Sequence, residues 1–223
     1  MEIVIVLGGP NTKENIKKLL ENRYGRAYED FCFVGVDGGA LRLLEQHLPI
    51  EVAIGDFDSV TKEQRDLIHE AAGTIAQLPS EKDDTDFEAA LLWVKEHYEG
   101  VSIHVLGSFG GRVDHAISTL WTMMRPDLAP LIPYVVFEDT TNVVNFIQPG
   151  TYTIEKMDFT KYLSFISMTP VENVTLKNVK YTLDSKSYAY PVALVSNEFT
   201  SDKMTISFTK GLILVAQTRD HWR

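Results

Sequence analysis

The sequence has a single cysteine, Cys32, among its 223 residues, so the chain cannot form an internal disulfide. Disulfides persist mainly in oxidising compartments, and this composition therefore favours a reducing one. The chain also lacks the Cys/His spacing of a zinc site. It has neither the GxxxxGK[ST] motif of P-loop enzymes nor GxGxxG after its first expected strand. No Ser-His-Asp arrangement can be argued from the sequence.

Long hydrophobic runs are missing as well. No stretch approaches the roughly 18 apolar residues of a membrane span. The first apolar run, residues 3–7, follows the acidic Glu2, whereas a secretory signal begins with basic residues and has a longer apolar stretch. We therefore expect a soluble, cytoplasmic protein without a membrane partner.

Basic residues are few. Lys and Arg number 21 against 31 Asp and Glu, which gives a net charge of -10. Such a chain is a poor non-specific ligand of nucleic acid, because phosphate contacts require Lys and Arg. Any phosphate chemistry would depend on a metal ion or on a few local basic groups. With 44% hydrophobic residues the composition is that of an ordered globular protein.

Residues 1–138 alternate strand-like and helix-like segments. The expected strands cover residues 3–7, 31–36, 52–54, 74–78 and 101–106, and the expected helices cover residues 13–23, 61–72, 87–98 and 115–124. This order predicts an α/β domain, in which a mostly parallel open sheet has helices on both faces. Residues 151–218 instead show alternating patterns rich in Val, Ile, Thr and aromatics, which predict an antiparallel β domain. We expect domains at 1–140 and 141–223.

Four short motifs follow four of the expected strands. They are VDGGA (36–40), GDFDS (55–59), SEKDDTDF (80–87) and GSFGGRVDH (107–115). In an open parallel sheet, ligands bind at the carboxyl ends of the strands, so four distant loops can meet at one site. The motifs share aspartate, namely Asp37, Asp56, Asp58, Asp83, Asp84, Asp86 and Asp114.

Several carboxylates at one place repel one another unless a cation neutralises them. Oxygen ligands with open positions suit Mg²⁺, which takes one or two carboxylates together with substrate phosphates. The glycines at 38, 39, 110 and 111 allow close approach of the backbone to a phosphate, and Arg112 and Lys82 supply positive charge. The residues indicate Mg²⁺-assisted chemistry on a nucleotide phosphate.

Each motif also has a structural interpretation. An aspartate before a helix is often only a cap or a first-turn residue, and Thr85 with Glu88 has capping-box spacing. In GDFDS, an extended chain would point Asp56 and Asp58 the same way. In the third motif we expect Thr85 to cap a helix, Asp83 and Asp86 to face the site, and Asp84 to be solvated. His104 is expected to be structural, and Trp93 and Trp121 to be partly buried.

Taken together, the motifs resemble those of the thiamine pyrophosphokinase family, which carries DGG, GDxDS, D-x-T-D and G-x-x-G-R-x-D in this order. In LVSNEF, Ser196-Asn197 resembles the family's Ser-Asn motif. The resemblance implies transfer of the pyrophosphate of ATP to thiamine, giving thiamine diphosphate and AMP. It also implies a C-terminal β-sandwich that helps to bind thiamine, and a homodimer with sites between subunits.

Site roles follow from the same resemblance. Asp56, Asp58 and Asp86 would position Mg²⁺ and phosphates, and together with Arg112 they are the expected catalytic residues. The ATP side would consist of Asp37, Gly38, Gly39, Lys82, Asp83, Thr85, Arg112 and Asp114. Ser196 and Asn197 would contact thiamine. The tryptophan that some members carry in the last strand is replaced here by Gly211-Leu212-Ile213-Leu214, with Trp222 near the terminus.

Three other functions compete with this interpretation. The same acidic α/β layout could serve a diphosphokinase that acts on a pterin alcohol, and the C-terminal half would then have to discriminate. A non-catalytic nucleotide or thiamine sensor would bind its ligand without metal-dependent turnover. A purely structural module would leave the clustered carboxylates unexplained.

Overall fold

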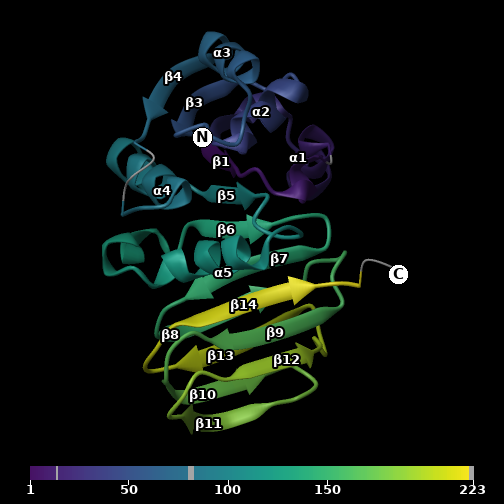
Figure 1. Cartoon of the computed structure of the whole chain (residues 1–223). Helices are drawn as coiled ribbons and strands as arrows, with labels where there is room; N and C mark the ends of the chain where they lie inside the picture. Colours follow the sequence, from purple (N-terminus) through teal and green to yellow (C-terminus); the bar gives the residue numbers. More distant parts are fainter. Residues whose placement is uncertain (14, 80–82, 221–223) are drawn as a thin grey trace. The chain divides into compact units, whose positions relative to one another are not determined.

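The computed structural model describes residues 1–13, 15–79 and 83–220 (Figure 1). Lys82 and Trp222, which the sequence analysis singled out, lie outside these ranges. The chain divides into two compact units, Met1–Asp139 and Thr140–Arg223.

The first unit is built on a parallel sheet. Its strands are β1 (Glu2–Val6), β2 (Phe31–Val36), β3 (Ile50–Gly55), β4 (Ala72–Gln77), β5 (Ile103–Leu106) and β6 (Val135–Glu138). They are ordered β6-β5-β1-β2-β3-β4, and every pair is parallel. The expected parallel sheet is confirmed, with β6 added to it.

Helices connect these strands. They are α1 (Ile16–Tyr24), α2 (Gly38–Glu45), α3 (Lys62–Ala71), α4 (Asp86–His97) and α5 (Val113–Trp121), with 3₁₀ turns η1 (Pro10–Lys13), η2 (Tyr28–Asp30), η3 (Thr122–Met124) and η4 (Pro126–Leu131). The sequence pattern did not predict α2, because two glycines open it. Its apolar side chains Ala40 and Leu43 are fully buried, and this packing outweighs the low helix propensity of glycine.

The core lies on both faces of the sheet. On one face, Val4 and Phe33 pack with Leu20 of α1 and Leu43 of α2. Alternate residues of the same strands point to the opposite face, where α4 contacts β2 and β3. Strands buried on both sides explain why their sequences are continuous apolar runs.

Over its described residues, 140–220, the second unit is built from strands without helices. The strands are β7 (Asn142–Ile147), β8 (Gly150–Glu155), β9 (Tyr162–Ser167), β10 (Val171–Lys177), β11 (Leu183–Tyr188), β12 (Ala193–Asn197), β13 (Lys203–Phe208) and β14 (Ile213–Thr218). Within this unit the strands follow the orders β12-β9-β14-β7 and β11-β10-β13-β8, and all pairs are antiparallel. Both sets contribute to one apolar cluster that includes Phe165, Leu176, Ile206 and Val215. This is the expected antiparallel β-sandwich.

Further details concern a turn between two strands and the exposure of two tryptophans. The apolar stretch 204–217 forms two strands, because Gly211 turns the chain at φ +103, and a Cβ there would lie 2.5 Å from the Pro170 carbonyl oxygen. Trp121 is 55% exposed, so its expected burial was wrong. Trp93 is half-buried, as expected. Among the described helices, none combines the length and apolar character that a membrane crossing would need.

Candidate active site

The described residues of the four motifs follow the carboxyl ends of parallel strands. VDGGA follows β2, GDFDS follows β3, the third motif follows β4, and the last one follows β5. Strands β2, β3 and β4 are neighbours, whereas β5 lies on the other side of β1. The direction of strand succession thus changes at β1, and this is where open α/β sheets bind ligands.

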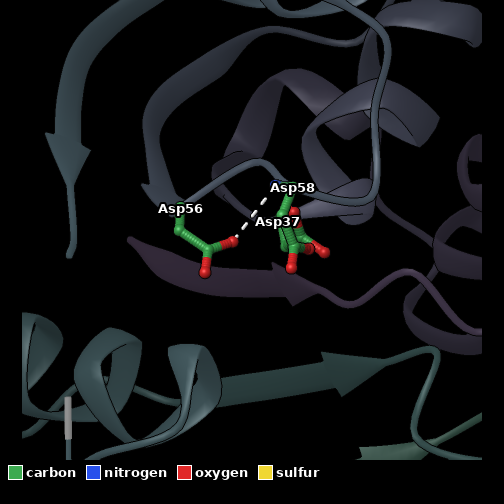
Figure 2. A group of neighbouring side chains, drawn as sticks. All are labelled: Asp37, Asp56 and Asp58. Atoms are coloured by element: carbon green, nitrogen blue, oxygen red, sulfur yellow. Dashed lines mark hydrogen bonds between the residues drawn. The ribbon is translucent and has the colours of Figure 1, made fainter. Parts of the chain in front are cut away.

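Three aspartates from two of these loops form one group. Asp37, Asp56 and Asp58 each place a carboxylate oxygen within 4.8 Å of the other two (Figure 2). Asp37 follows β2, and the other two follow β3. Asp58 is exposed, while Asp37 and Asp56 are half-buried. The group is a set of hard oxygen ligands, one of which, Asp58, is exposed to solvent.

A tight turn, and not an extended chain, brings Asp56 and Asp58 together. Phe57 between them has φ 57, a left-handed conformation. The Asp58 backbone N–H donates to Asp56 Oδ1 at 3.1 Å, shown as the dashed line in Figure 2. Phe57 is 1% exposed and packs edge-on against His69. Burial of this ring holds the turn, so the extended interpretation of GDFDS was wrong.

Asp37 is held in a strained conformation at the start of α2. Its φ of 46 and ψ of -122 are unusual for a residue with a side chain. Its N–H donates to the Ile54 carbonyl oxygen at 2.9 Å, which ties the motif to β3. Its Oδ1 is buried and has no hydrogen-bond partner among the described residues.

The environment of Asp37 disfavours its charge. Burial raises the pKa of this carboxyl group, and the negative charges of Asp86 and Asp58 raise it further. Hydrogen bonds from Ser59 and Gly38 act in the opposite direction, but the pKa remains above its ordinary value. A cation bound here would reduce the repulsion between the carboxylates and would give the buried Asp37 Oδ1 a partner.

The glycines of the first motif serve close packing. A Cβ on Gly39 would lie 1.8 Å from the Val6 carbonyl oxygen, so only glycine lets α2 approach the end of β1. The loop after β1 lies against two of the motifs. A Cβ on Gly8 would be 3.5 Å from Gly38 Cα, and one on Gly9 would be 2.0 Å from the Gly107 carbonyl oxygen.

Gly8 and Gly9 therefore belong to the candidate site, although the sequence analysis did not select them. Their position after the first strand was visible in the sequence. What the sequence did not show is that this strand is central in the sheet, with the first and fourth motifs on its two sides.

The third motif opens α4. Thr85 caps the helix as expected: its hydroxyl accepts from the Glu88 N–H, and Glu88 Oε2 accepts from the Thr85 N–H. Asp83 is exposed, and Asp86 is a half-buried first-turn residue. Asp86 is not part of the group of three aspartates, but its charge acts on Asp37.

Asp84 was expected to be solvated, and this was wrong. Its carboxylate forms an ion pair with Arg125, which follows η3. The sequence could not show this partner, because the two residues are 41 positions apart.

The fourth motif presents an exposed ion pair. Arg112 Nη2 donates to Asp114 Oδ2 at 2.6 Å, and Nε donates to Oδ1 at 3.2 Å. The hydrogen bond from Arg112 lowers the pKa of Asp114 to about 2. The Arg112 side chain is 71% exposed and can therefore exchange this partner for another anion.

In the second unit, the two residues of the Ser-Asn motif lie differently. Ser196 is exposed and has φ 59. Asn197 is 4% exposed, and its amide is engaged with the backbone: Oδ1 accepts from the N–H groups of Tyr181 and Glu198, and Nδ2 donates to the Tyr181 carbonyl oxygen. Asn197 thus joins β12 to the segment before β11.

Comparison with known proteins agrees with this arrangement. Residues 28–133 match the family model for the thiamin pyrophosphokinase catalytic domain, and residues 151–213 match the model for its vitamin B1 binding domain. The chain is 33% identical to thiamine pyrophosphokinase of Bacillus subtilis over 98% of this chain and 99% of that one. The chain belongs to the thiamin pyrophosphokinase family.

Solved structures of the family support the fold over its whole length. A thiamin pyrophosphokinase family protein from Enterococcus faecalis superposes with a TM-score of 0.88 at 32% identity, covering 99% of this chain and 100% of that one. The Bacillus subtilis thiamine pyrophosphokinase structure gives 0.82 at 31% identity, with the same coverage. Thiamin pyrophosphokinases transfer pyrophosphate, so this chain is an enzyme, and the resemblance inferred from the motifs is confirmed.

Proposed function

We propose that the chain transfers the pyrophosphate of ATP to the hydroxyl group of thiamine, forming thiamine diphosphate and AMP in a Mg²⁺-dependent reaction. The observation that carries the metal dependence is the group formed by Asp37, Asp56 and Asp58 within the match to the catalytic domain. Three carboxylates this close together are unfavourable without a cation.

These residues fit Mg²⁺ by their chemistry. The group offers only carboxylate oxygens, the ligand type that Mg²⁺ prefers, and the unsatisfied Oδ1 of Asp37 is available to it. We propose that Asp37, Asp56 and Asp58 hold the ion, with Asp86 acting beside them. Asp37 thus joins the metal set that the sequence suggested. When bound, Mg²⁺ would neutralise charge on the phosphate oxygens of ATP.

The loops at the carboxyl ends of β1, β2 and β5 would bind the triphosphate. Gly8, Gly9, Gly38 and Gly39 keep the backbone free of side chains there. Arg112 would leave Asp114 in part to stabilise the charge that develops on the phosphates. Asp83, Thr85 and Asp114 remain proposed ATP-side residues, as does Lys82.

The chemical step is a displacement at phosphorus. The thiamine hydroxyl oxygen forms a bond to the β-phosphorus of ATP, and the bond from this phosphorus to the oxygen bridging to the α-phosphate breaks. AMP leaves with that oxygen, and an aspartate of the site accepts the alcohol proton.

The vitamin B1 side would lie in the second unit. The exposed Ser196 would contact thiamine directly, while Asn197 would act by holding the Ser196 and Tyr181 segments together. The net charge of -10 attracts the positively charged thiazolium ring.

We also propose a homodimer with sites between subunits. Helix α5 carries a stripe of exposed apolar side chains four residues apart: Val113, Ile117 and Trp121 are 72%, 48% and 55% exposed. A surface of this kind is typical of a protein–protein contact, and a second copy of the chain is the occupant that the family resemblance implies. ATP as the donor also fits the cytoplasmic location, which remains a prediction.

Purified protein should form AMP and thiamine diphosphate in equal amounts from ATP, thiamine and Mg²⁺, and neither product after chelation of the metal. Parallel reactions with hydroxymethylpterin test the pterin diphosphokinase. If the protein turns over the pterin but not thiamine, the pterin alcohol is the substrate. Binding of thiamine without turnover would select the sensor.

A further inference from the structure

Arg125 joins two parts of the candidate site that are distant in sequence. It follows α5 and η3, the elements that begin at the Arg112 motif. Its guanidinium contacts Asp84 and Glu88, which lie on either side of Thr85 and Asp86. Arg125 itself lies outside the four motifs, and the sequence pattern gave no reason to select it.

The Arg125 guanidinium contacts three carboxylates, those of Asp127, Asp84 and Glu88. Nη2 and Nε donate to the two carboxylate oxygens of Asp127 at 2.8 and 3.1 Å, a bidentate pair that fixes the orientation of the arginine. Nη1 is thereby directed at Asp84 and lies 3.4 Å from Glu88 Oε1. Lys95 of α4 donates to the Asp127 carbonyl oxygen at 2.6 Å, so the same short segment is also tied to the helix farther along.

The two carboxylate oxygens of Glu88 have different partners. Oε2 accepts from the N–H and hydroxyl groups of Thr85 and closes the capping box, whereas Oε1 faces Arg125. Arg125 is therefore connected to Asp84, which precedes the cap, and to the residue that closes it. The backbone of Asp86, whose charge acts on Asp37, lies between these two anchors.

Charge gives a second reason for this arrangement. Asp83, Asp84, Asp86 and Glu88 place four carboxylates within six residues. Without a cation they would repel one another, and the loop would tend to spread. The Arg125 side chain is 28% exposed, and the side chain of Glu88 is 16% exposed, so the attraction is less screened than at an open surface.

We propose that Arg125 is a positioning residue for pyrophosphate transfer: it holds the 83–88 segment so that Asp86 stands beside the Asp37–Asp56–Asp58 group and favours binding of Mg²⁺ there. The inference rests on the proposed function. It assigns Arg125 no contact with substrate, and its effect passes through Asp84 and Glu88.

The test compares Arg125→Met, Arg125→Lys, Asp84→Asn and the double variant Arg125→Met with Asp84→Asn. Two quantities are measured on the full chain: the Mg²⁺ concentration for half-maximal activity, and the Kd of Mg²⁺ for the protein without nucleotide, by calorimetry. Arg125→Met should raise both by about tenfold, the scale of coupling through a positioning network. Arg125→Lys should recover part of the effect, because it keeps the charge but loses the fork of donors.

The double variant should bind Mg²⁺ no more weakly than the more affected single variant, because both substitutions break the same Arg125–Asp84 ion pair. Lys203→Met is the matched control. It removes one positive charge and an exposed ion pair with Glu155 in the second unit, and it should keep wild-type values. Asp84→Asn, at a side chain that is 40% exposed, provides the test if Arg125→Met does not fold.

Unchanged Mg²⁺ affinity in Arg125→Met and Asp84→Asn would overturn the proposal, as would a loss of activity that only follows the loss of folded protein. Absence of thiamine diphosphate from the wild-type reaction is a different result. It would reject the proposed function, while the calorimetric Kd would still decide whether Arg125 organises the metal-binding loop.

Discussion

At the scale of single residues, the site depends on carboxylates that the fold forces together. Asp37 combines a strained backbone, a buried oxygen that has no partner in the described part of the chain, and neighbours of like charge. Each of these features costs stability, and such costs concentrate at functional sites. Asp56 and Asp58 are brought together by the buried ring of Phe57. We infer that these features lower the stability of the metal-free site, and that a bound cation would restore part of it.

Asp86→Asn should abolish turnover while the protein stays folded. The substitution keeps the shape of the side chain but removes a charge beside Asp37, so the loss should exceed about 100-fold. The measurement is the rate of AMP formation, with the thermal midpoint of unfolding as the control for folding. Normal turnover in this variant would remove Asp86 from the catalytic set.

His104 should make the stability of the fold depend on pH. Burial by itself lowers its pKa, but hydrogen bonds and charges from Glu138 and Glu2 raise it by more, so the net shift is upward. Tyr24 of α1 also contacts the imidazole at 2.8 Å, and Arg23 and Arg26 of the same segment bind the two glutamates.

Because the folded pKa lies above the ordinary value of 6.5, this contribution is complete below pH 6.5 and is lost as the pH rises through the folded pKa. Denaturant unfolding at a series of pH values should show the free energy of unfolding falling in that window. His104→Gln should flatten this part of the profile. An equally steep profile in the variant would assign the pH dependence to other groups.

At the scale of elements, local capping and distant packing act together. The starts of α3 and α4 both have capping boxes, Thr61 with Gln64 and Thr85 with Glu88. Such pairs are readable in the sequence, because they lie three residues apart. The opposite case is α2, which begins at two glycines and exists because it packs closely on β1.

Thr85→Ala should lower the free energy of unfolding by about 1 kcal/mol, the usual cost of losing an N-cap hydroxyl. Thr85 is exposed, so little else changes on substitution. Thr85→Ser retains the acceptor and should restore most of the stability in the same denaturant titration. Equal stability of the alanine and serine variants would show that the cap contributes nothing measurable.

At the scale of the whole molecule, the apolar stripe on α5 should set the oligomeric state. Trp121→Glu places a charge in that stripe and should shift the proposed homodimer towards monomer in sedimentation measurements, because desolvating an unpaired charge at an interface is costly. Leu67→Glu is the control, since Leu67 is also an exposed apolar residue on a helix, at 52%. A Trp121→Glu protein that remains dimeric would place the interface elsewhere.

The family, the class of fold and the residues at the strand ends were all readable in the sequence. The alternation of strand-like and helix-like segments predicted a parallel sheet with helices on both faces, and the ordered motifs after strands predicted where the chemistry would lie. These are local signals, since strand period, caps and motif spacing involve residues near one another in the chain.

Only the tertiary structure decided which of those residues meet. It grouped Asp37 with Asp56 and Asp58, paired Asp84 with Arg125, and placed the Gly8-Gly9 loop between two motifs. The order of the strands and the burial of rings such as Phe57 fix these contacts. Both depend on how segments far apart in the chain pack, and for that reason the local sequence pattern did not reveal them.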